Sequence, residues 1–324
     1  MIFADLSPFW LTVVQNTIDG LAFGSLIALI ALGYTMVYGI VELINFAHGD
    51  LFMLGSFVCL SALAIVGFAG LGFKGTLTFD TASTVTIALA LIACLVSAMI
   101  FCAGLNFTVD HLIYKPLRKA PKLAPLVSAI GLSMIFMNIG LFWGGPQDVD
   151  FPKLIPDENL IGDASGLKLK AKVVMVFAVT FPLMLILTGI VKYTALGRAM
   201  RATAQNPTAA KLMGVDTDRI IGITFAIGGA LAGVSSLVYA LYINTISYQM
   251  GFQNGLYAFT AAVIGGIGRI PGAVLGGLII GLVRYHGSEY VGENWIGALI
   301  FGILIVILIF RPTGLLGAPT REKV

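Results

Sequence analysis

Hydrophobic runs long enough to cross a lipid bilayer recur along the whole chain. A membrane-spanning helix needs about 20 mostly apolar residues, and seven segments come close to or exceed that length. They are Thr17–Ile40, Leu51–Phe68, Val85–Leu105, Leu123–Trp143, Val173–Val191, Ile220–Ile243 and Trp295–Phe310. Of the 324 residues, 58% are hydrophobic and 11% are charged, whereas a soluble domain has about 25% charged residues. The chain is therefore predicted to be an all-α, polytopic membrane protein with about seven full spans.

One further apolar region, Leu256–Val283, is interrupted in its middle by residues that break helices. The interruption consists of Gly265, Gly266, Gly268, Arg269 and Pro271. Backbone that leaves helical geometry at membrane depth is tolerated only where it is buried in protein or lines a cavity. This region is expected to form two short helices, either as a re-entrant hairpin or as two short spans.

The loops indicate how the chain is oriented. Tyr114–Lys122 and Lys192–Arg219 are rich in Lys and Arg, which marks the cytoplasmic side of a membrane protein. Gly144–Lys172 carries several acids and is expected outside, although its lysines weaken the contrast. The N-terminus is then outside and the C-terminus cytoplasmic, and residues 1–324 form a single transmembrane domain with a cytoplasmic loop at 192–219. The first ten residues lack Lys and Arg, so a removable signal peptide is not expected.

Polar residues interrupt the chain between the first two spans, at Glu42, Asn45, His48 and Asp50. An ionised side chain near the bilayer centre costs roughly 2.5–3.5 kcal/mol or more without partners. These residues therefore either line a pathway or lie near an interface. Asp50 is expected to cap the helix that starts at Leu51, because Asp is a good N-cap residue.

A second polar group, Gln15, Asn16, Thr17 and Asp19, marks the outer end of the first span. It is either a solvated helix start or the outer mouth of a pathway. Small residues also recur at helical spacing, at Gly20 and Gly24, Gly229 and Gly233, Gly272 and Gly276, and Gly277 and Gly281. Such pairs allow close packing of membrane helices.

Motifs for chemistry are absent from the sequence. The glycines at 265–268 lack the Lys-Ser/Thr pair of a phosphate-binding loop, so the chain is not expected to hydrolyse ATP or to be an enzyme. No second His or Cys accompanies His48 at metal-ligand spacing, so neither a metal nor a cofactor is expected. Cys59, Cys94 and Cys102 lie in apolar stretches and are predicted to be buried thiols. A net charge of +3 does not indicate a nucleic-acid partner.

The loop Lys192–Arg219 is the most soluble part of the predicted cytoplasmic face. Ala195–Ala204 and Thr208–Met213 favour helix, and Pro207 suits the first turn of the second one. Leu212 and Met213 would give that helix an exposed apolar patch, which is typical of a docking site.

Five motifs, in order along nearly the whole chain, resemble the permease subunit of the high-affinity branched-chain amino-acid ABC importers. They are Gly33–Gly39 (GYTMVYG), Ile44–Asp50 (INFAHGD), Gly197–Arg201 (GRAMR), Ala258–Gly268 (AFTAAVIGGIG) and Arg311–Gly317 (RPTGLLG). The resemblance implies a bacterial inner-membrane importer of leucine, isoleucine and valine. Its expected partners are a second related permease, two cytoplasmic ATPases and a periplasmic binding protein.

The resemblance also implies a loop that couples the permease to its ATPases. ABC permeases carry a Glu-Ala-Ala-x-x-x-Gly segment for this purpose, and Thr208–Gly214 (TAAKLMG) is similar but has Thr where Glu is usual. The expected coupling residues are Arg198, Arg201, Thr208, Ala209, Ala210, Leu212 and Gly214. Relatives in the superfamily carry urea or short-chain amides, so the substrate stays open. A self-sufficient secondary transporter or channel is the alternative from another class.

Overall fold

The computed structural model confirms an all-α membrane protein and describes residues 8–41, 43, 45–67, 84–118, 120–121, 123–160 and 166–317. Within these ranges, eight helices are long and apolar enough to cross a membrane. They contain α1 (Pro8–Val41), α2 (Ala47–Val66), α3 (Thr84–Val109), α5 (Leu123–Gly144), α6 (Ala171–Tyr193), α9 (Thr217–Ile243), α11 (Ile270–Tyr290) and α12 (Ile296–Phe310). A ninth helix, α10 (Met250–Gly265), has 16 residues and is shorter.

Shorter elements connect these helices. A π-helical turn, Asp110–Tyr114, and α4 (Lys115–Leu117) continue α3, whereas α7 (Ala195–Gln205) and α8 (Pro207–Leu212) lie between α6 and α9. A 3-10 turn, Glu293–Trp295, precedes α12. The strands β1 (Val149–Asp150) and β2 (Thr245–Ile246) pair antiparallel, with Val149 opposite Ile246.

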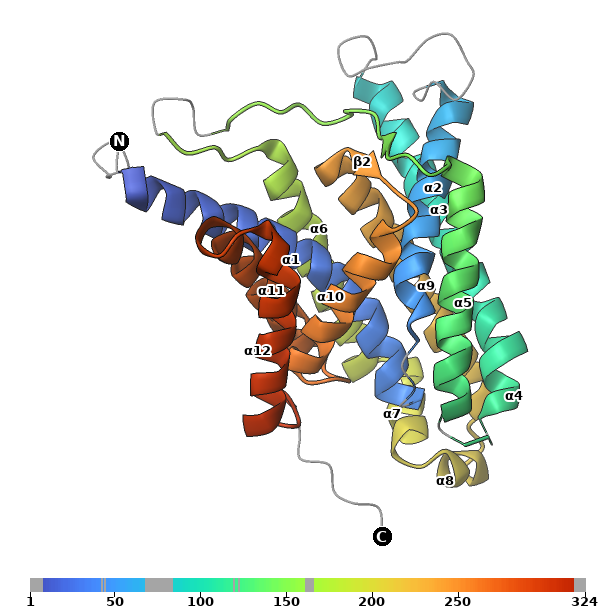
Figure 1. Ribbon diagram of the computed structural model, residues 1–324. Helices are drawn as coiled ribbons and strands as arrows, with labels where there is room; N and C mark the ends of the chain where they lie inside the picture. Colours follow the sequence, from blue (N-terminus) through green and yellow to red (C-terminus); the bar gives the residue numbers. More distant parts are fainter. Residues whose placement is uncertain are drawn as a thin grey trace.

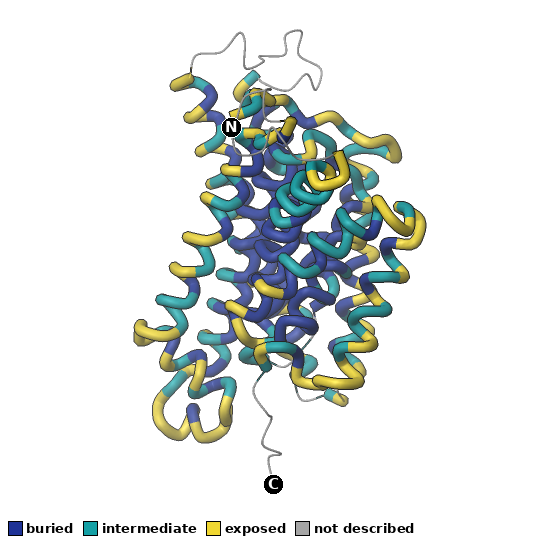
Figure 2. Tube along the Cα trace, turned by 90° about the vertical axis from the view of Figure 1, so that its left-hand side faces the viewer, coloured by how far each residue is buried: buried dark blue, intermediate teal, exposed yellow. Residues whose placement is uncertain are grey.

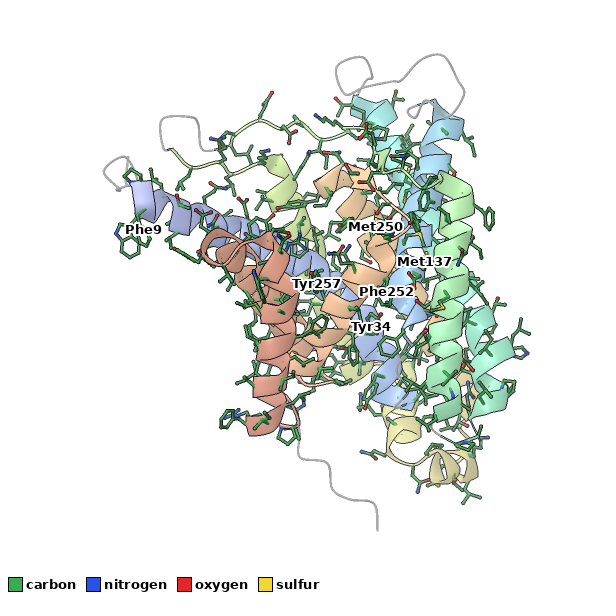
Figure 3. The ribbon with its side chains drawn as sticks, in the orientation of Figure 1. Phe9, Tyr34, Met137, Met250, Phe252 and Tyr257 are labelled. Atoms are coloured by element: carbon green, nitrogen blue, oxygen red, sulfur yellow. The ribbon has the colours of Figure 1, made fainter. Side chains whose placement is uncertain are left out.

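The helices form a bundle whose middle is filled by α1, α2 and α9 (Figure 1). Buried residues concentrate there, and exposed residues occur on the outer helices and at both ends (Figure 2). Tyr34 of α1 and Tyr257 of α10 lie in the middle of the molecule, whereas Phe9 projects from the start of α1 at the periphery (Figure 3). Large apolar side chains of α3, α5, α6 and α12 face outwards, as expected for helices in contact with lipid.

The first helix is longer than a bilayer is thick. Its 34 residues extend about 50 Å at 1.5 Å per residue, against a hydrocarbon core of about 30 Å. A helix of this length must tilt or project, and α1 crosses the bundle obliquely (Figure 1).

Glycine pairs predicted from their spacing lie where helices cross. A Cβ on Gly281 of α11 would lie 2.0 Å from the carbonyl oxygen of Gly20 of α1, and one on Gly24 would lie 2.7 Å from that of Gly277. On α9, a Cβ on Gly233 would lie 2.6 Å from the backbone of Ala98. The absent side chains thus allow backbone-to-backbone contact in the middle of the bundle.

Two predicted helix starts and one predicted helix length were wrong. α1 begins at Pro8 rather than Thr17, because hydroxyls of Thr12 and Thr17 bond to carbonyls one turn earlier and keep polar residues within the helix. α2 begins at Ala47 rather than Leu51. The broken region does form two helices, but α11 has 21 residues and is not short.

Candidate functional site

The polar interruption is partly helical. α2 includes His48 and Asp50 in its first turn, and Phe46 occupies the N-cap position without a side-chain bond. The prediction that Asp50 caps this helix was therefore wrong, because the helix begins before it. Glu42, also expected here, lies outside the described residues.

Asn45 connects three segments of the bundle. It is 4% exposed, and its Oδ1 accepts a hydrogen bond of 2.9 Å from Tyr114 Oη. Its Nδ2 donates to Asn106 Oδ1 at 3.4 Å, and Asn106 in turn donates to the Phe225 carbonyl at 2.6 Å. Asn45 therefore links the start of α2 to α3, its π-helical continuation and α9.

His48 and Asp50 are buried on different partners. The His48 ring lies 4.8 Å from that of Tyr34 in an edge-to-face arrangement, and a Cβ on Gly33 would occupy its place, at 2.2 Å from Nε2. Neither ring nitrogen has a hydrogen-bond partner in the described part of the chain. Asp50 accepts a short hydrogen bond from Ser133 of α5 through Oδ2. The two side chains are thus held by different contacts.

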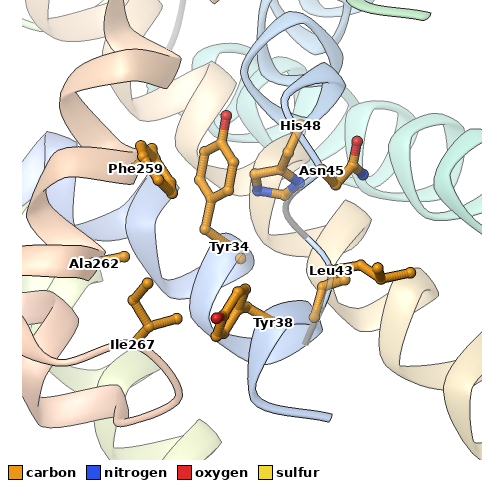
Figure 4. Close-up of a pocket in the computed structure, with 10 residues that line it drawn as sticks. Tyr34, Tyr38, Leu43, Asn45, His48, Phe259, Ala262 and Ile267 are labelled. Carbon is orange, nitrogen blue, oxygen red and sulfur yellow. The ribbon is translucent and has the colours of Figure 1, made fainter. Parts of the chain in front are cut away.

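A small pocket lies beside these residues, between α1, the start of α2 and α10 (Figure 4). Tyr34, Asn45, His48, Phe259 and Ile267 contribute to its walls. The free space is about 10 Å³, which holds about one water molecule. This pocket has no room for anything larger in this conformation.

The glycine-rich break between α10 and α11 is a tight turn covered by the C-terminal segment. Gly266 and Gly268 have φ of 102° and 87°, values that glycine adopts readily. Amides of Leu315 and Leu316 donate to the carbonyls of Ile264 and Gly265, at 2.8 and 3.0 Å. These bonds satisfy carbonyls left free where α10 ends.

Neighbouring residues of the break are distributed between the interior and solvent. Gly265 packs against Gly272 of α11, since a Cβ on Gly265 would lie 1.8 Å from the Gly272 carbonyl oxygen. Arg269 is exposed.

The loop between α6 and α9 contains the two predicted helices. Asn206 Oδ1 accepts from the amides of Thr208 and Ala209, both at 3.0 Å, and so caps α8 at its N-terminus. At the other end Gly214 has a φ of 84°, and the Val215 amide donates to the Ala210 carbonyl at 3.0 Å. This pattern is a Schellman-type helix end.

The two loop helices differ in what they expose. Leu212 and Met213 of the α8 end are 83% and 84% exposed, as predicted, whereas Ala210 is buried. Arg198, Thr208 and Ala209 are exposed. Arg201 is also exposed, and its guanidinium donates to the carbonyls of Val191 and Lys192 at the end of α6, where a cation is favoured.

An ion-pair network next to this loop was not predicted. Arg118 pairs with Asp110 at 2.7 Å and with Asp218 at 2.6 Å, and Lys115 lies 3.8 Å from Asp218. It ties the end of α3 to the start of α9. The basic loop and Asp218 were both visible in the sequence, but nothing in the sequence placed them together.

A second polar site was also missed. A cavity of about 610 Å³, here called the outer cavity, lies at the bundle end opposite α8, next to β2. Its walls come from the first half of α1, the loop after α5, the start of α6, the end of α9 and α11. The charged residues that line it are Asp19, Asp150, Lys153, Asp157, Lys168, Lys170 and Lys172.

Several of these charges are paired. The Lys172 ammonium lies 3.0 Å from Asp157 Oδ1, and Lys170 lies 3.8 Å from the same atom. The hydrogen bond from Lys172 holds the pKa of Asp157 below its ordinary value. Gln15 Nε2 donates to Asp19 at 2.8 Å, so the polar start of α1 belongs to this cavity. The lysines of Gly144–Lys172, which weakened the charge difference between the two sides of the membrane, thus line the outer cavity.

Comparisons with known proteins point to one family. The model of the family described as branched-chain amino acid transport system / permease component matches residues 16–309. The chain is 38% identical over 313 residues to the high-affinity branched-chain amino acid transport system permease protein BraD of Pseudomonas aeruginosa, covering 96% of this chain and 98% of that protein.

Two further relatives are similar to the chain over different shares of their length. The chain is 37% identical over 321 residues to the high-affinity branched-chain amino acid transport system permease protein LivH of Escherichia coli K12, covering 98% and 100% of the two chains. It is 28% identical over 200 residues to the autoinducer 2 import system permease protein LsrC of Salmonella paratyphi B, covering 57% and 55%.

Proposed function

This chain belongs to the family of branched-chain amino acid transport permease components, and we propose that it works as one membrane subunit of an ATP-driven importer of leucine, isoleucine and valine. Its partners would be a second related permease, two cytoplasmic ATPases and a periplasmic binding protein. The chain itself would hydrolyse nothing. Residues 1–324 form a single transmembrane domain of this importer in the bacterial inner membrane, with the N-terminus outside and the C-terminus in the cytoplasm.

The observation that carries the proposal is the α7–α8 loop, residues 192–219. α8 is capped at both ends by its own sequence, yet it presents Leu212 and Met213 almost fully to solvent. Apolar side chains on a rigid, exposed helix are typical of a protein-binding surface. A secondary transporter has no use for such a surface, whereas an importer driven by separate ATPases requires one.

The polar residues in the middle would then lie along the route of the substrate. The pocket beside Asn45 and His48 has room for about one water molecule, so passage of an amino acid requires α10 to move relative to α1 and α2. The break at Gly265–Arg269 ends α10 and is where such a movement would be absorbed.

Co-purification and uptake test this function together. The importer is purified through a tag on this chain from cells that express all its expected subunits, and reconstituted with the binding protein. We expect two ATPases and a sibling permease to co-purify, and leucine uptake to require ATP. A double variant, Leu212→Asn with Met213→Asn, should lose the ATPases while the sibling permease remains. A control change at the opposite bundle end, Leu160→Asn, replaces another exposed leucine and should lose neither.

Two results would overturn the proposal. Leucine uptake by this chain alone, without ATPases, would make it a secondary transporter or channel. ATP-dependent uptake of urea or short-chain amides, with no uptake of leucine, isoleucine or valine, would replace the substrate.

A further inference from the structure

The outer cavity contains a hydrogen-bond donor that lacks an acceptor. Asn244 Oδ1 accepts a short hydrogen bond from the Lys172 ammonium, which leaves the Nδ2 of the same amide for another partner. That nitrogen is buried and has no hydrogen-bond partner among the described residues. Leaving a buried amide donor unpaired costs about 1–3 kcal/mol. An acceptor that reaches this nitrogen would therefore be favoured.

The backbone holds Asn244 firmly in position. It ends α9 in the left-handed region, with a φ of 59°, and its amide donates to the Ala240 carbonyl at 2.9 Å. Its own carbonyl accepts from the Phe151 amide at 2.9 Å. The side-chain amide is thus fixed by both α9 and the segment after β1, and is preorganised for binding.

Lys172 provides a second donor at the same place. Its side chain is only 7% exposed, and an ammonium has three hydrogens. Asn244 and Asp157 accept two of them, which leaves one for a further acceptor. A buried ammonium beside an unpaired amide favours a carboxylate, because charge-assisted hydrogen bonds are the strong ones.

The same walls also carry free acids. Asp150 lines the cavity and is exposed, and no ion pair involves it within the described ranges. Asp19 accepts from the Gln15 amide and likewise has no cation within ion-pair distance in the part of the chain that the structure describes. These carboxylates favour a cation in the cavity, next to the position that favours an anion.

We propose that the outer cavity binds a free α-amino acid as a zwitterion, with its carboxylate at Lys172 and Asn244 and its ammonium towards Asp19 and Asp150. The volume of about 610 Å³ lies within the usual range of small-molecule sites, about 300–1,000 Å³. A neutral amide offers neither a carboxylate to Lys172 nor an ammonium to Asp19 and Asp150, and a simple anion offers only the carboxylate. The proposal rests on the proposed function, because it gives the importer a waiting site at the outer end of the bundle.

Protection of a cysteine tests this site. A Lys168→Cys variant places a thiol on the exposed wall, where the side chain of Lys168 makes no described bond and only its backbone pairs with Gln15. The three native cysteines are buried and free, so within this chain an impermeant methanethiosulfonate should label only the new one. Right-side-out vesicles carry the complete importer and are washed free of binding protein. Tyr290→Cys, 62% exposed and away from the cavity walls, is the control.

Leucine should slow labelling at Lys168→Cys by threefold or more and leave Tyr290→Cys unchanged. Isocaproate and leucinamide each lack one of the two charges and should need about tenfold higher concentrations, since one charge-assisted bond corresponds to at least a tenfold change. The neutral isovaleramide should protect least.

Two substitutions of Asn244 separate binding from folding. Asn244→Gly removes the amide but accepts the positive φ. Asn244→Asp keeps an acceptor for Lys172, replaces the free donor by a negative charge and also tolerates this backbone region. Both should raise the leucine concentration for half protection about tenfold or more, while labelling without leucine stays unchanged.

Absence of protection by leucine, or equal protection by all four compounds, would overturn the proposed site. Uptake of leucine after ATP and binding protein are restored shows separately whether the proposed function stands. Transport without protection removes only the cavity proposal, and protection without transport removes only the importer proposal.

Discussion

The middle of the bundle and its two ends differ in how much room they leave. In the middle, polar side chains such as Asn45 are bonded to neighbouring helices, and the pocket beside them holds about one water molecule. At one end, charged residues line about 610 Å³, and at the other α8 exposes its apolar residues. Two glycines with positive φ show the same difference. Backbone atoms surround Gly266 at the turn after α10, whereas nothing lies within 4 Å of a Cβ on Gly214 at the end of α8.

This contrast separates residues that hold the bundle together from residues left for partners. Close contact in the middle means that a substitution there acts first on folding. Open space at the ends means that a substitution there acts first on what binds. The predictions below try to break this division.

The largest effect is expected from Gly266→Val. A Cβ at this position would lie 2.5 Å from Gly317 N and 2.8 Å from its Cα, and valine does not adopt a φ of 102° without strain. Both leucine uptake and the melting temperature of the purified complex should fall strongly. Uptake falls below about a tenth of normal if the substitution raises the free-energy barrier of transport by more than about 1.4 kcal/mol.

A matched control separates collision from strain. Gly268 also has a positive φ, but its nearest neighbour for a Cβ is Gly39 Cα at 3.4 Å. Gly268→Val should therefore lose less stability than Gly266→Val. Equal losses would mean that the close packing of the C-terminal segment contributes nothing.

The next effect is expected from Gly214→Arg, and it should spare folding. The substitution meets no neighbour and has only backbone strain of about 1–3 kcal/mol to overcome. Because it adds a bulky charge next to Met213, it should abolish uptake and the stimulation of ATP hydrolysis by loaded binding protein. Membrane insertion should persist.

Gly214→Asn is the control for that strain, because Asn tolerates a left-handed backbone. It should retain most of the coupling. If the Arg variant also retains coupling, the docking surface is elsewhere, and the loop of Arg118 is the next candidate.

A smaller effect is expected from Asn45→Leu. The change removes the hydrogen bonds with Tyr114 and Asn106, and side-chain hydrogen bonds within membrane proteins contribute about 0.6 kcal/mol on average and up to about 1.7. The protein should insert and assemble, lose stability of this order and transport more slowly. Thermal unfolding of the complex and initial uptake rates measure the two effects.

A double-mutant cycle with Tyr114→Phe tests the reason. The two substitutions should be less than additive, because each removes the same bond. Strict additivity together with normal uptake would leave Asn45 without a role in either packing or transport.

The sequence predicted features whose signals are local. Apolar runs located the spans, Pro207 located the start of α8, and the glycines at 265–268 located the turn between α10 and α11. Each of these depends on neighbours within a few residues, so a linear reading suffices.

Features assembled from distant segments were not predictable in the same way. Gln15 and Lys168 meet across 153 positions of the sequence, and Arg118 meets Asp218 across 100. In the sequence these polar and charged residues are far apart. Only folding brings them together in the wall of a cavity or in an ion-pair network. The early start of α1 was missed for a related reason, since its polar residues pair within the helix and so do not end it.

The smallest effect is expected from cysteines that report only which end faces which side. Leu160→Cys lies in the acidic loop and is 59% exposed in the wild type, and Gln205→Cys lies at the exposed end of α7. Neither should change stability or uptake, because neither side chain makes a described contact with the middle of the bundle. The excess of Lys and Arg around α7 and α8 predicts that this end is cytoplasmic. An impermeant thiol reagent should therefore label Leu160→Cys in intact cells and Gln205→Cys only after permeabilisation. The reverse pattern would place the outer cavity in the cytoplasm and remove both the docking surface and the waiting site in one experiment.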